Sequence, residues 1–287
     1  DLDISADITI EGNGSTVQRD PSYGCNIDLY LDLYEFRIFH VLNSSAKLTL
    51  KDLTVQHGCV DRSTGYFGGG IFNQGGTLTL MNSTVSNNKA LQGGGMQSQQ
   101  GQLTMTNSII ANNTVYGCCG GGIADFNGTL TISNSTISGN TANNVYAGNV
   151  GNGGGIYSQG SNVINITDST ISNNTATSPG GYGDGGGIHI FSSSTTITIT
   201  NSTISGNSAL HSGGGIYSWG NLTVENSTFY NNSVSSSPYS SSGGGGGIEN
   251  VGKLTVKNST FVNNYTQGGG GGIVNVDTLT IINSTIS

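Results

Sequence analysis

One unit recurs eight times along this chain, and it restricts the fold more than any other feature. Each copy begins with a glycine triplet that leads into Ile or Met, continues with alternating apolar and polar residues, and ends in an Asn-Ser-Thr-like unit. The residues that follow the triplets are Ile71, Met96, Ile123, Ile156, Ile188, Ile216, Ile248 and Ile273. A phosphate-binding glycine loop occurs once and carries a Lys. The repetition therefore argues against nucleotide binding and in favour of a repeat architecture.

The spacing within the unit predicts short β-strands. Leu78 and Leu80 alternate with Thr79, as in a strand with one buried face, and no period near 3.6 is seen. Four residues always separate the Leu78-type residue from the Asn82-type residue, and six more lead to the Asn88-type residue. Fixed spacings place successive coils in register, which predicts an all-β, single-stranded parallel β-helix. We expect residues 1–67 to form degenerate coils or a cap, and residues 68–287 to form regular coils that continue beyond the end of this sequence.

The repeated glycines and asparagines are expected to have structural roles. The triplets are expected at tight corners, where a Cβ would not fit. The Asn82-type column is expected to form a hydrogen-bonded ladder from coil to coil. Asp168 interrupts this column as a tolerated defect. The predicted ladder residues are Asn82, Asn107, Asn134, Asn201, Asn226, Asn258 and Asn283.

One connection in the repeat varies in length. From the Asn88-type residue to the next triplet-following residue, it runs from 8 residues (Asn88 to Met96) to 16 (Asn140 to Ile156). The insertions should therefore emerge as variable loops on one edge of the rod. They are rich in Gly, Ser and Asn with single tyrosines, which is typical of adaptable contact loops; unselected surface loops are the alternative. The tyrosines are Tyr146, Tyr182 and Tyr239.

Charge and apolar patterning limit the partners. The formal net charge is −8 with only 8% charged residues, and no Lys or Arg occurs from Ala90 to Gly252. No basic patch for nucleic acid is present, and no run is long enough for a membrane-spanning helix. The acids concentrate near the N-terminus, where solvated surface is the favoured interpretation and a calcium ion is the alternative. No other cofactor is expected.

The cysteines and glycosylation sequons are less informative. Cys25 and Cys59 are candidates for a disulfide, whereas a bridge between the adjacent Cys118 and Cys119 would be strained and rare. Such bridges fit an oxidising, extracellular setting. Sequons that the repeat does not explain are candidate glycosylation sites. They are Asn112, Asn173, Asn231 and Asn264.

Two outward features suggest binding surfaces. Tyr157, His189 and Tyr217 follow the triplet-following residue by one position, so they should stack on successive coils, with Trp219 near them. We favour a stabilising stack, and sugar binding is the alternative. The Thr79-type column resembles an ice-binding lattice, but Thr is also a good solvent-facing strand residue.

The sequence offers little support for an enzyme. Asp184, Glu249 and the other acids of the regular coils fall at different places in their repeats, so we expect them on different faces or coils. His189 and His211, like the other histidines, show no partner pattern. Glycoside hydrolysis needs clustered carboxylates. A non-enzymatic role is therefore expected, with polysaccharide lyase or hydrolase activity as the alternative.

The Gly-Gly-Gly-Ile and Asn-Ser-Thr-Ile-Ser-x-Asn units resemble secreted bacterial surface proteins built as right-handed parallel β-helices. A looser similarity to polymorphic autotransporter passengers rests on Phe-x-x-Asn at 229–232 and 261–264. The resemblance implies right-handedness, a secreted or cell-surface location and a structural or adhesive role, and it carries over no catalytic residues. We expect copies of the chain to assemble into a fibre or sheath. A monomeric adhesin that binds surface polysaccharide is the alternative.

Overall fold

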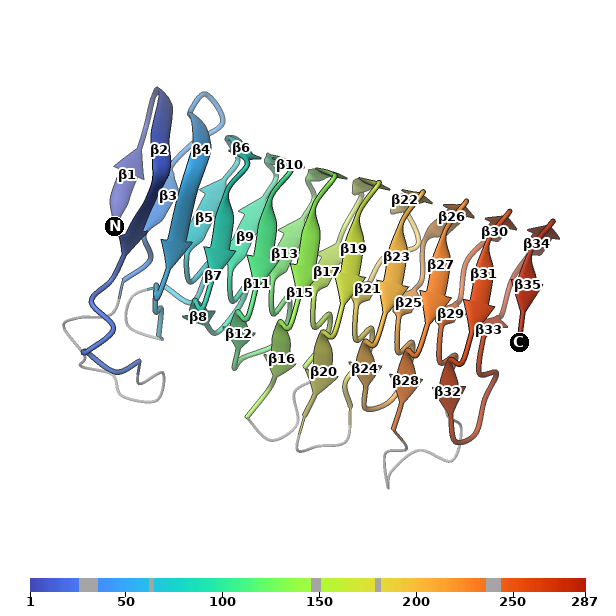
Figure 1. The fold of residues 1–287 in the computed structure, drawn as a ribbon. Helices are drawn as coiled ribbons and strands as arrows, with labels where there is room; N and C mark the ends of the chain where they lie inside the picture. Colours follow the sequence, from blue (N-terminus) through green and yellow to red (C-terminus); the bar gives the residue numbers. More distant parts are fainter. Residues whose placement is uncertain (26–35, 62–64, 146–150, 179–181, 236–243) are drawn as a thin grey trace.

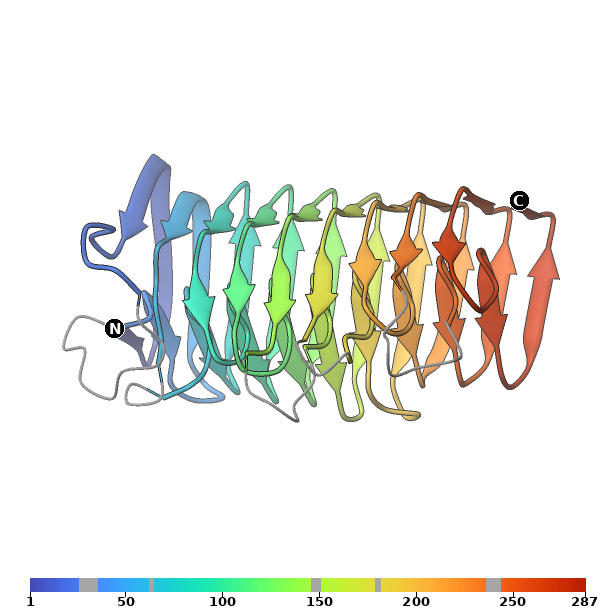
Figure 2. The ribbon, with the colours of Figure 1, turned by 90° about the horizontal axis from the view of Figure 1, so that it is seen from below.

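The chain coils into a rod built only from parallel strands. The computed structural model describes residues 1–287 except 26–35, 62–64, 146–150, 179–181 and 236–243. Successive coils stack side by side, and the N- and C-termini lie at opposite ends (Figure 1). The view from below shows the same order of coils along the rod (Figure 2). Among the described residues, no helix has the length and apolar character needed to cross a membrane.

The first sheet has ten strands, one from each coil. Neighbouring strands pair in parallel, with Ile123 opposite Met96 on one side and Ile156 on the other. Its strands are β1 (Leu2–Ile4), β3 (Phe39–Val41), β5 (Ile71–Gln74), β9 (Met96–Gln99), β13 (Ile123–Phe126), β17 (Ile156–Gln159), β21 (Ile188–Ile190), β25 (Ile216–Ser218), β29 (Ile248–Asn250) and β33 (Ile273–Asn275).

The second sheet has eighteen strands and bends at the Asn82-type residues, so that most coils contribute two strands. They are β2 (Asp7–Gln18), β4 (Lys47–Gln56), β6 (Thr77–Met81), β7 (Thr84–Ser86), β10 (Gln102–Thr106), β11 (Ile109–Ala111), β14 (Thr129–Ser133), β15 (Thr136–Ser138), β18 (Val163–Thr167), β19 (Thr170–Ser172), β22 (Thr196–Thr200), β23 (Thr203–Ser205), β26 (Asn221–Glu225), β27 (Thr228–Tyr230), β30 (Leu254–Lys257), β31 (Thr260–Val262), β34 (Leu279–Ile282) and β35 (Thr285–Ile286).

The third sheet has seven short strands. They are β8 (Lys89–Ala90), β12 (Thr114–Val115), β16 (Thr141–Asn143), β20 (Thr175–Thr177), β24 (Ser208–Ala209), β28 (Ser233–Val234) and β32 (Tyr265–Thr266). The connections of variable length all run from this sheet to the next strand of the ten-stranded sheet, so the insertions share one edge of the rod (Figure 1). The predicted parallel β-helix with variable loops on one edge is confirmed.

The core is a single stripe of apolar side chains that point into the rod. Leu78, Leu80 and Val85 are fully buried, while Thr79 and Thr84 face outward and are partly exposed. The same alternation recurs in each regular coil, because the strands are in register. Each coil can bury its apolar face only against its neighbours, as in other solenoids.

A continuous asparagine ladder exists, but it lies six residues beyond the column in which we predicted it. Asn140 illustrates the pattern: its side-chain oxygen accepts from the backbone N–H and the amide of Asn113, and its own amide donates to Asn174 and to the carbonyl of Ile110. These side chains are buried from Asn88 to Asn232. The ladder residues are Asn88, Asn113, Asn140, Asn174, Asn207, Asn232 and Asn264.

The predicted ladder on Asn82, Asn107, Asn134, Asn201, Asn226, Asn258 and Asn283 is present only in part. These residues have φ between 46° and 50° and form the bend in the eighteen-stranded sheet. Asn readily adopts the left-handed backbone conformation that such a bend requires. The side chains at the bend are exposed to solvent. They make separate pairs, Asn82 with Asn107 and Asn226 with Asn258, and Asp168 accepts from Asn201. The adjacent serines from Ser83 onward form a second buried ladder instead.

The glycine triplets form the predicted corners for two separate reasons. Gly153 has φ +65°, and a Cβ there would lie 2.4 Å from the carbonyl oxygen of Ile156. A Cβ on Gly154 would lie 2.4 Å from the carbonyl oxygen of Gly186 in the next coil. Both distances are shorter than real contacts allow. The first glycine thus permits a turn back onto the sheet, and the second permits close stacking of coils.

Two disulfides join described cysteines. Cys25 is bridged to Cys59, with Cα atoms 5.8 Å apart. The adjacent Cys118 and Cys119 are also bridged, contrary to the expectation that this pairing would be disfavoured.

Candidate functional site

The outer face of the ten-stranded sheet carries two parallel columns of side chains. The first lies one position after each triplet-following residue, and we call it the covered column. It contains Phe72, Gln97, Ala124, Tyr157, His189, Tyr217 and Glu249. The second lies two positions further along the same strands or just past their ends, and we call it the outer strip. It contains Gln74, Gln99, Phe126, Gln159, Phe191 and Trp219.

The covered column is hidden because the chain turns back over it before each triplet. A Cβ on Gly185 would lie 2.7 Å from the Cβ of His189, and one on Gly153 would lie 2.9 Å from the Cα of Tyr157. As a result, Tyr157 is 6% exposed and His189 is 1% exposed. Burial lowers the pKa of His189 to about 4, so its ring is neutral near pH 7.

Two residues of the predicted sugar-binding group, Tyr157 and His189, are therefore too deeply buried to contact a sugar directly. Tyr157 and His189 pack beneath the surface, and with Tyr217 their rings form an edge-to-face stack, with centroids 5.4 Å and 5.0 Å apart and interplanar angles of 65° and 87°. Tyr217 is partly buried, and burial raises its pKa to about 12. Only Trp219 of that group is well exposed, at 42%. The stack has the geometry of the stabilising ladder that we favoured.

The outer strip presents rings and amides to solvent on successive coils. Phe191 is 48% exposed, its ring lies 5.9 Å from that of Trp219, and the Trp219 indole N–H donates to the Tyr217 hydroxyl at 2.9 Å. Phe126 packs 5.7 Å from Tyr157, whose hydroxyl donates to Gln159 at 3.1 Å. The buried stack thus holds the exposed rings and amides of the strip in place.

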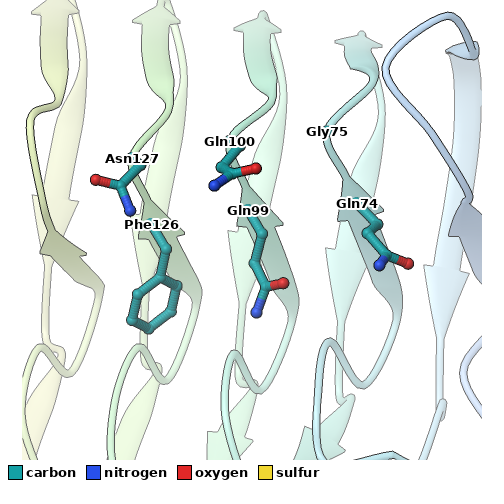
Figure 3. A pocket seen from close by; sticks show the side chains of 6 residues that line it. All are labelled: Gln74, Gly75, Gln99, Gln100, Phe126 and Asn127. Atoms are coloured by element: carbon teal, nitrogen blue, oxygen red, sulfur yellow. The ribbon is translucent and has the colours of Figure 1, made fainter.

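A hollow of about 320 Å³ opens at one end of the outer strip. Figure 3 shows Gln74, Gln99 and Phe126 side by side from adjacent strands, with Gln100 and Asn127 at the turns above them. Gln100 and Asn127 have positive φ, so these turns direct polar side chains beside the strip. Amides and an aromatic edge around a shallow hollow are suited to hydroxyl-rich ligands.

An acid–histidine cluster lies at the other end of this face, formed by Asp184, His211, Ser212 and Glu249. His211 Nδ1 lies 2.8 Å from a carboxyl oxygen of Asp184, and this bond raises the pKa of His211. Asp184 pairs with Ser212 in the next coil, and burial raises the pKa of Glu249. Glu249 stands opposite Tyr217 in the sheet.

This cluster corrects one expectation, because His211 has a partner, Asp184. Asp184 and Glu249 lie on different coils, as the expected scatter over faces or coils allowed, although the cluster brings them onto one face. They meet because the residue before each triplet turns back over the sheet, which places Asp184 and Ser212 above the covered column. The repeat register contained this signal, since Asp184 and Ser212 both immediately precede a triplet.

The remaining predicted positions are scattered. Tyr182 is 45% exposed and its ring lies 5.6 Å from His211, whereas Tyr146 and Tyr239 lie outside the described residues. Of the four sequon residues, Asn112, Asn173 and Asn231 are exposed. Asn264 is a poor glycan acceptor, because its amide donates to Phe229 and its oxygen accepts from Asn232 in the ladder.

At the N-terminal end, Asp1, Asp3 and His40 bring ligand atoms within 4.8 Å of one another. Arg37 lies 3.4 Å from Asp1 and already neutralises part of this charge. A calcium ion in this region therefore stays a prediction.

The outer strip was the main feature that sequence reasoning missed. Phe126, Phe191 and Trp219 each stand three residues after a triplet-following residue, as do Gln74, Gln99 and Gln159. This fixed offset, combined with strand alternation, places all six on one outward line. The signal was present in the repeat, but it alternates between aromatic and amide residues and so does not stand out by residue type.

Comparison with known proteins gave one match. A family model described as "Right handed beta helix region" matches residues 37–234 and 142–286, which together span most of the chain. A search of curated proteins found no match. A search of solved structures found none either.

Proposed function

We propose that this chain, which belongs to the right-handed β-helix family, is a secreted or cell-surface protein that binds polysaccharide along its outer strip. The observation that carries the proposal is the line of exposed or half-exposed rings and amides on six successive coils. Strand spacing of about 4.8 Å makes this line about 24 Å long, which suits an extended chain of several sugars.

The chemistry of the strip supports a sugar ligand over a lipid or a protein core. Phe191 and Trp219 offer apolar faces for stacking, while Gln74, Gln99 and Gln159 offer both donors and acceptors. The strip contains no cluster of large aliphatic side chains, which an apolar partner would need. A secreted location is supported by the two disulfides, since such bonds persist in oxidising compartments.

The test is a binding panel of neutral and charged oligosaccharides, measured by calorimetry and by mobility in polysaccharide-containing gels. Trp219→Ala and Phe191→Ala should each weaken binding about tenfold, or about 1.4 kcal/mol. Tyr230→Ala is the matched control, because Tyr230 is 39% exposed on β27 in the eighteen-stranded sheet. Absence of binding to every saccharide, or an equal loss in the control, would refute the proposal.

A second candidate role is assembly of copies into a fibre or sheath. Leu279 and Ile281 in β34 are 42% and 43% exposed, whereas Leu254 and Val256, one coil earlier in the same columns, are at most 1% exposed. A further coil would cover these side chains, whether another copy or a continuing chain supplies it. This role is compatible with sugar binding, because the strip runs along the side of the rod.

A further inference from the structure

The stretch of chain that forms most of the outer strip carries net negative charge. From Ala90 to Gly252 the sequence contains five acids and no Lys or Arg. Two of them, Asp184 and Glu249, meet at the acid–histidine cluster beside Tyr217 and Trp219. Burial keeps His189 neutral, so His211 is the only group of the cluster that can carry positive charge, and the pKa of His211 is raised by its bond to Asp184.

The position of the cluster makes this charge available to a ligand on the strip. Glu249 stands opposite Tyr217, and the Tyr217 hydroxyl accepts the indole N–H of Trp219. Asp184 and His211 keep side chains 16% and 27% exposed. An exposed indole next to carboxylates is an arrangement that favours cations over anions.

We infer that the outer strip and the acid–histidine cluster bind a polysaccharide that carries positive charge, such as a polymer of unacetylated amino sugars. The inference rests on the proposed function and specifies its substrate class. The strip supplies stacking and hydrogen bonds, and the carboxylates of Asp184 and Glu249 receive the ammonium groups. A uronic acid polymer would instead meet these carboxylates, with only His211 as a basic group in the cluster and no Lys or Arg from Ala90 to Gly252.

The experiment compares three hexasaccharides at pH 7.5: N-acetylglucosamine, N-trimethylated glucosamine and galacturonate. The trimethylated probe keeps its charge at every pH. We expect it to bind at least tenfold more tightly than the acetylated one, with this preference reduced at high salt. Glu249→Gln should weaken binding of the trimethylated probe about fivefold more than it weakens binding of the acetylated probe. Lowering the pH should also weaken binding of the trimethylated probe, since His211 and Glu249 take up protons.

Asp168→Asn is the matched control, because Asp168 is exposed at the bend of the eighteen-stranded sheet and Asn is the usual residue of its column. It removes the same charge and should change neither affinity more than twofold. Equal affinity for the acetylated and trimethylated probes, tighter binding of galacturonate, or an equal effect of the control would overturn the charge inference while leaving sugar binding intact. No binding of any hexamer would instead refute the proposed function itself.

Discussion

At the residue scale, Asp125 is the most unusual side chain of the core. It points inward from β13, is fully buried, and neither carboxyl oxygen has a hydrogen-bond partner among the described residues. Asn73 and Asn250 occupy the equivalent position in other coils, and each donates its amide to a nearby backbone carbonyl. An ionised carboxylate cannot donate in this way. Burial accordingly raises the pKa of Asp125 to about 7.

This pKa makes stability depend on pH. The unfolded chain loses the Asp125 proton near pH 4, whereas the folded chain keeps it until about pH 7. Between these values the folded state holds more protons, so the free energy of unfolding falls as pH rises. The contribution of Asp125 to the free energy of unfolding should be highest below pH 4. It should fall by on the order of 4 kcal/mol as the pH rises and stay constant above about pH 7.

Asp125→Asn should therefore stabilise the rod at pH 8 and have little effect at pH 4.5. The amide restores the donor found at Asn73 and removes the titration. Thermal unfolding followed by circular dichroism at the two pH values measures the difference. Asp168→Asn is the control at an exposed site. A pH dependence in Asp125→Asn as steep as in the unmodified chain would contradict the explanation.

Residues of this kind mark the limit of sequence reasoning. Alternation places Asp125, two residues after Ile123, on the inward face, but the sequence does not show that its carboxyl group meets no hydrogen-bond partner there. The roles of Asn82 and Asn88 are also not separated by the sequence. Both columns repeat with fixed spacing, and only the left-handed bend at the Asn82-type residues shows which of the two points into the rod.

At the element scale, the ladder of Asn88-type residues ties the eighteen-stranded sheet to the seven-stranded sheet. Each rung satisfies one backbone N–H of the preceding coil, one carbonyl and one neighbouring amide. Asn140→Ala would leave the backbone N–H of Asn113 and the carbonyl of Ile110 without their partners. Buried groups left unsatisfied cost about 1–3 kcal/mol each.

We expect Asn140→Ala to lower the free energy of unfolding by at least about 3 kcal/mol, measured by urea denaturation. Asn134→Gly is the matched control, since Asn134 is exposed with φ 46° and glycine adopts that conformation freely. It should change stability by less than about 1 kcal/mol. Hydrogen exchange at the Asn113 amide gives a local readout. A similar loss in both variants would show that the ladder does not stabilise the coil stack.

The strands themselves were predictable because their cause is local. Alternation such as Leu78, Thr79, Leu80 fixes a strand with one inward face, and constant spacing fixes the register. The covering of Tyr157 and His189 was not predictable in the same way. It depends on the backbone returning over the sheet at Gly153 and Gly185, and the repeat alone does not reveal which side of the strand that return covers.

At the scale of the whole molecule, assembly is the prediction to check. If the exposed apolar side chains of β34 and β35 dock a second copy, sedimentation velocity across a concentration series should show growth of elongated species. Leu279→Asp and Ile281→Asp should abolish that growth, while Val163→Asp, an exposed position on β18, should not. Single rods at every concentration would contradict assembly by this chain and leave sugar binding as its remaining proposed role.

The architecture of the whole molecule followed from the repeat, but the function did not. A parallel β-helix offers several faces, and each carries its own columns of repeated side chains. Thr79-type, Asn82-type and Gln74-type columns are equally regular. Regularity therefore identifies the scaffold, while the departures from it, such as Phe126, Phe191, Trp219, Asp184 and Glu249, identify the candidate site.

The register of the coils also has a genetic consequence. Because Asn82 and Asn107 occupy equivalent positions 25 residues apart, an in-frame duplication or loss of residues 82–106 would join one coil to the next with every column preserved. Such an event would change the length of the rod by about 4.8 Å without creating a new kind of interface. A gene of this design can vary the reach of its product in whole coils, and it can place more or fewer outer-strip positions along the rod by recombination alone.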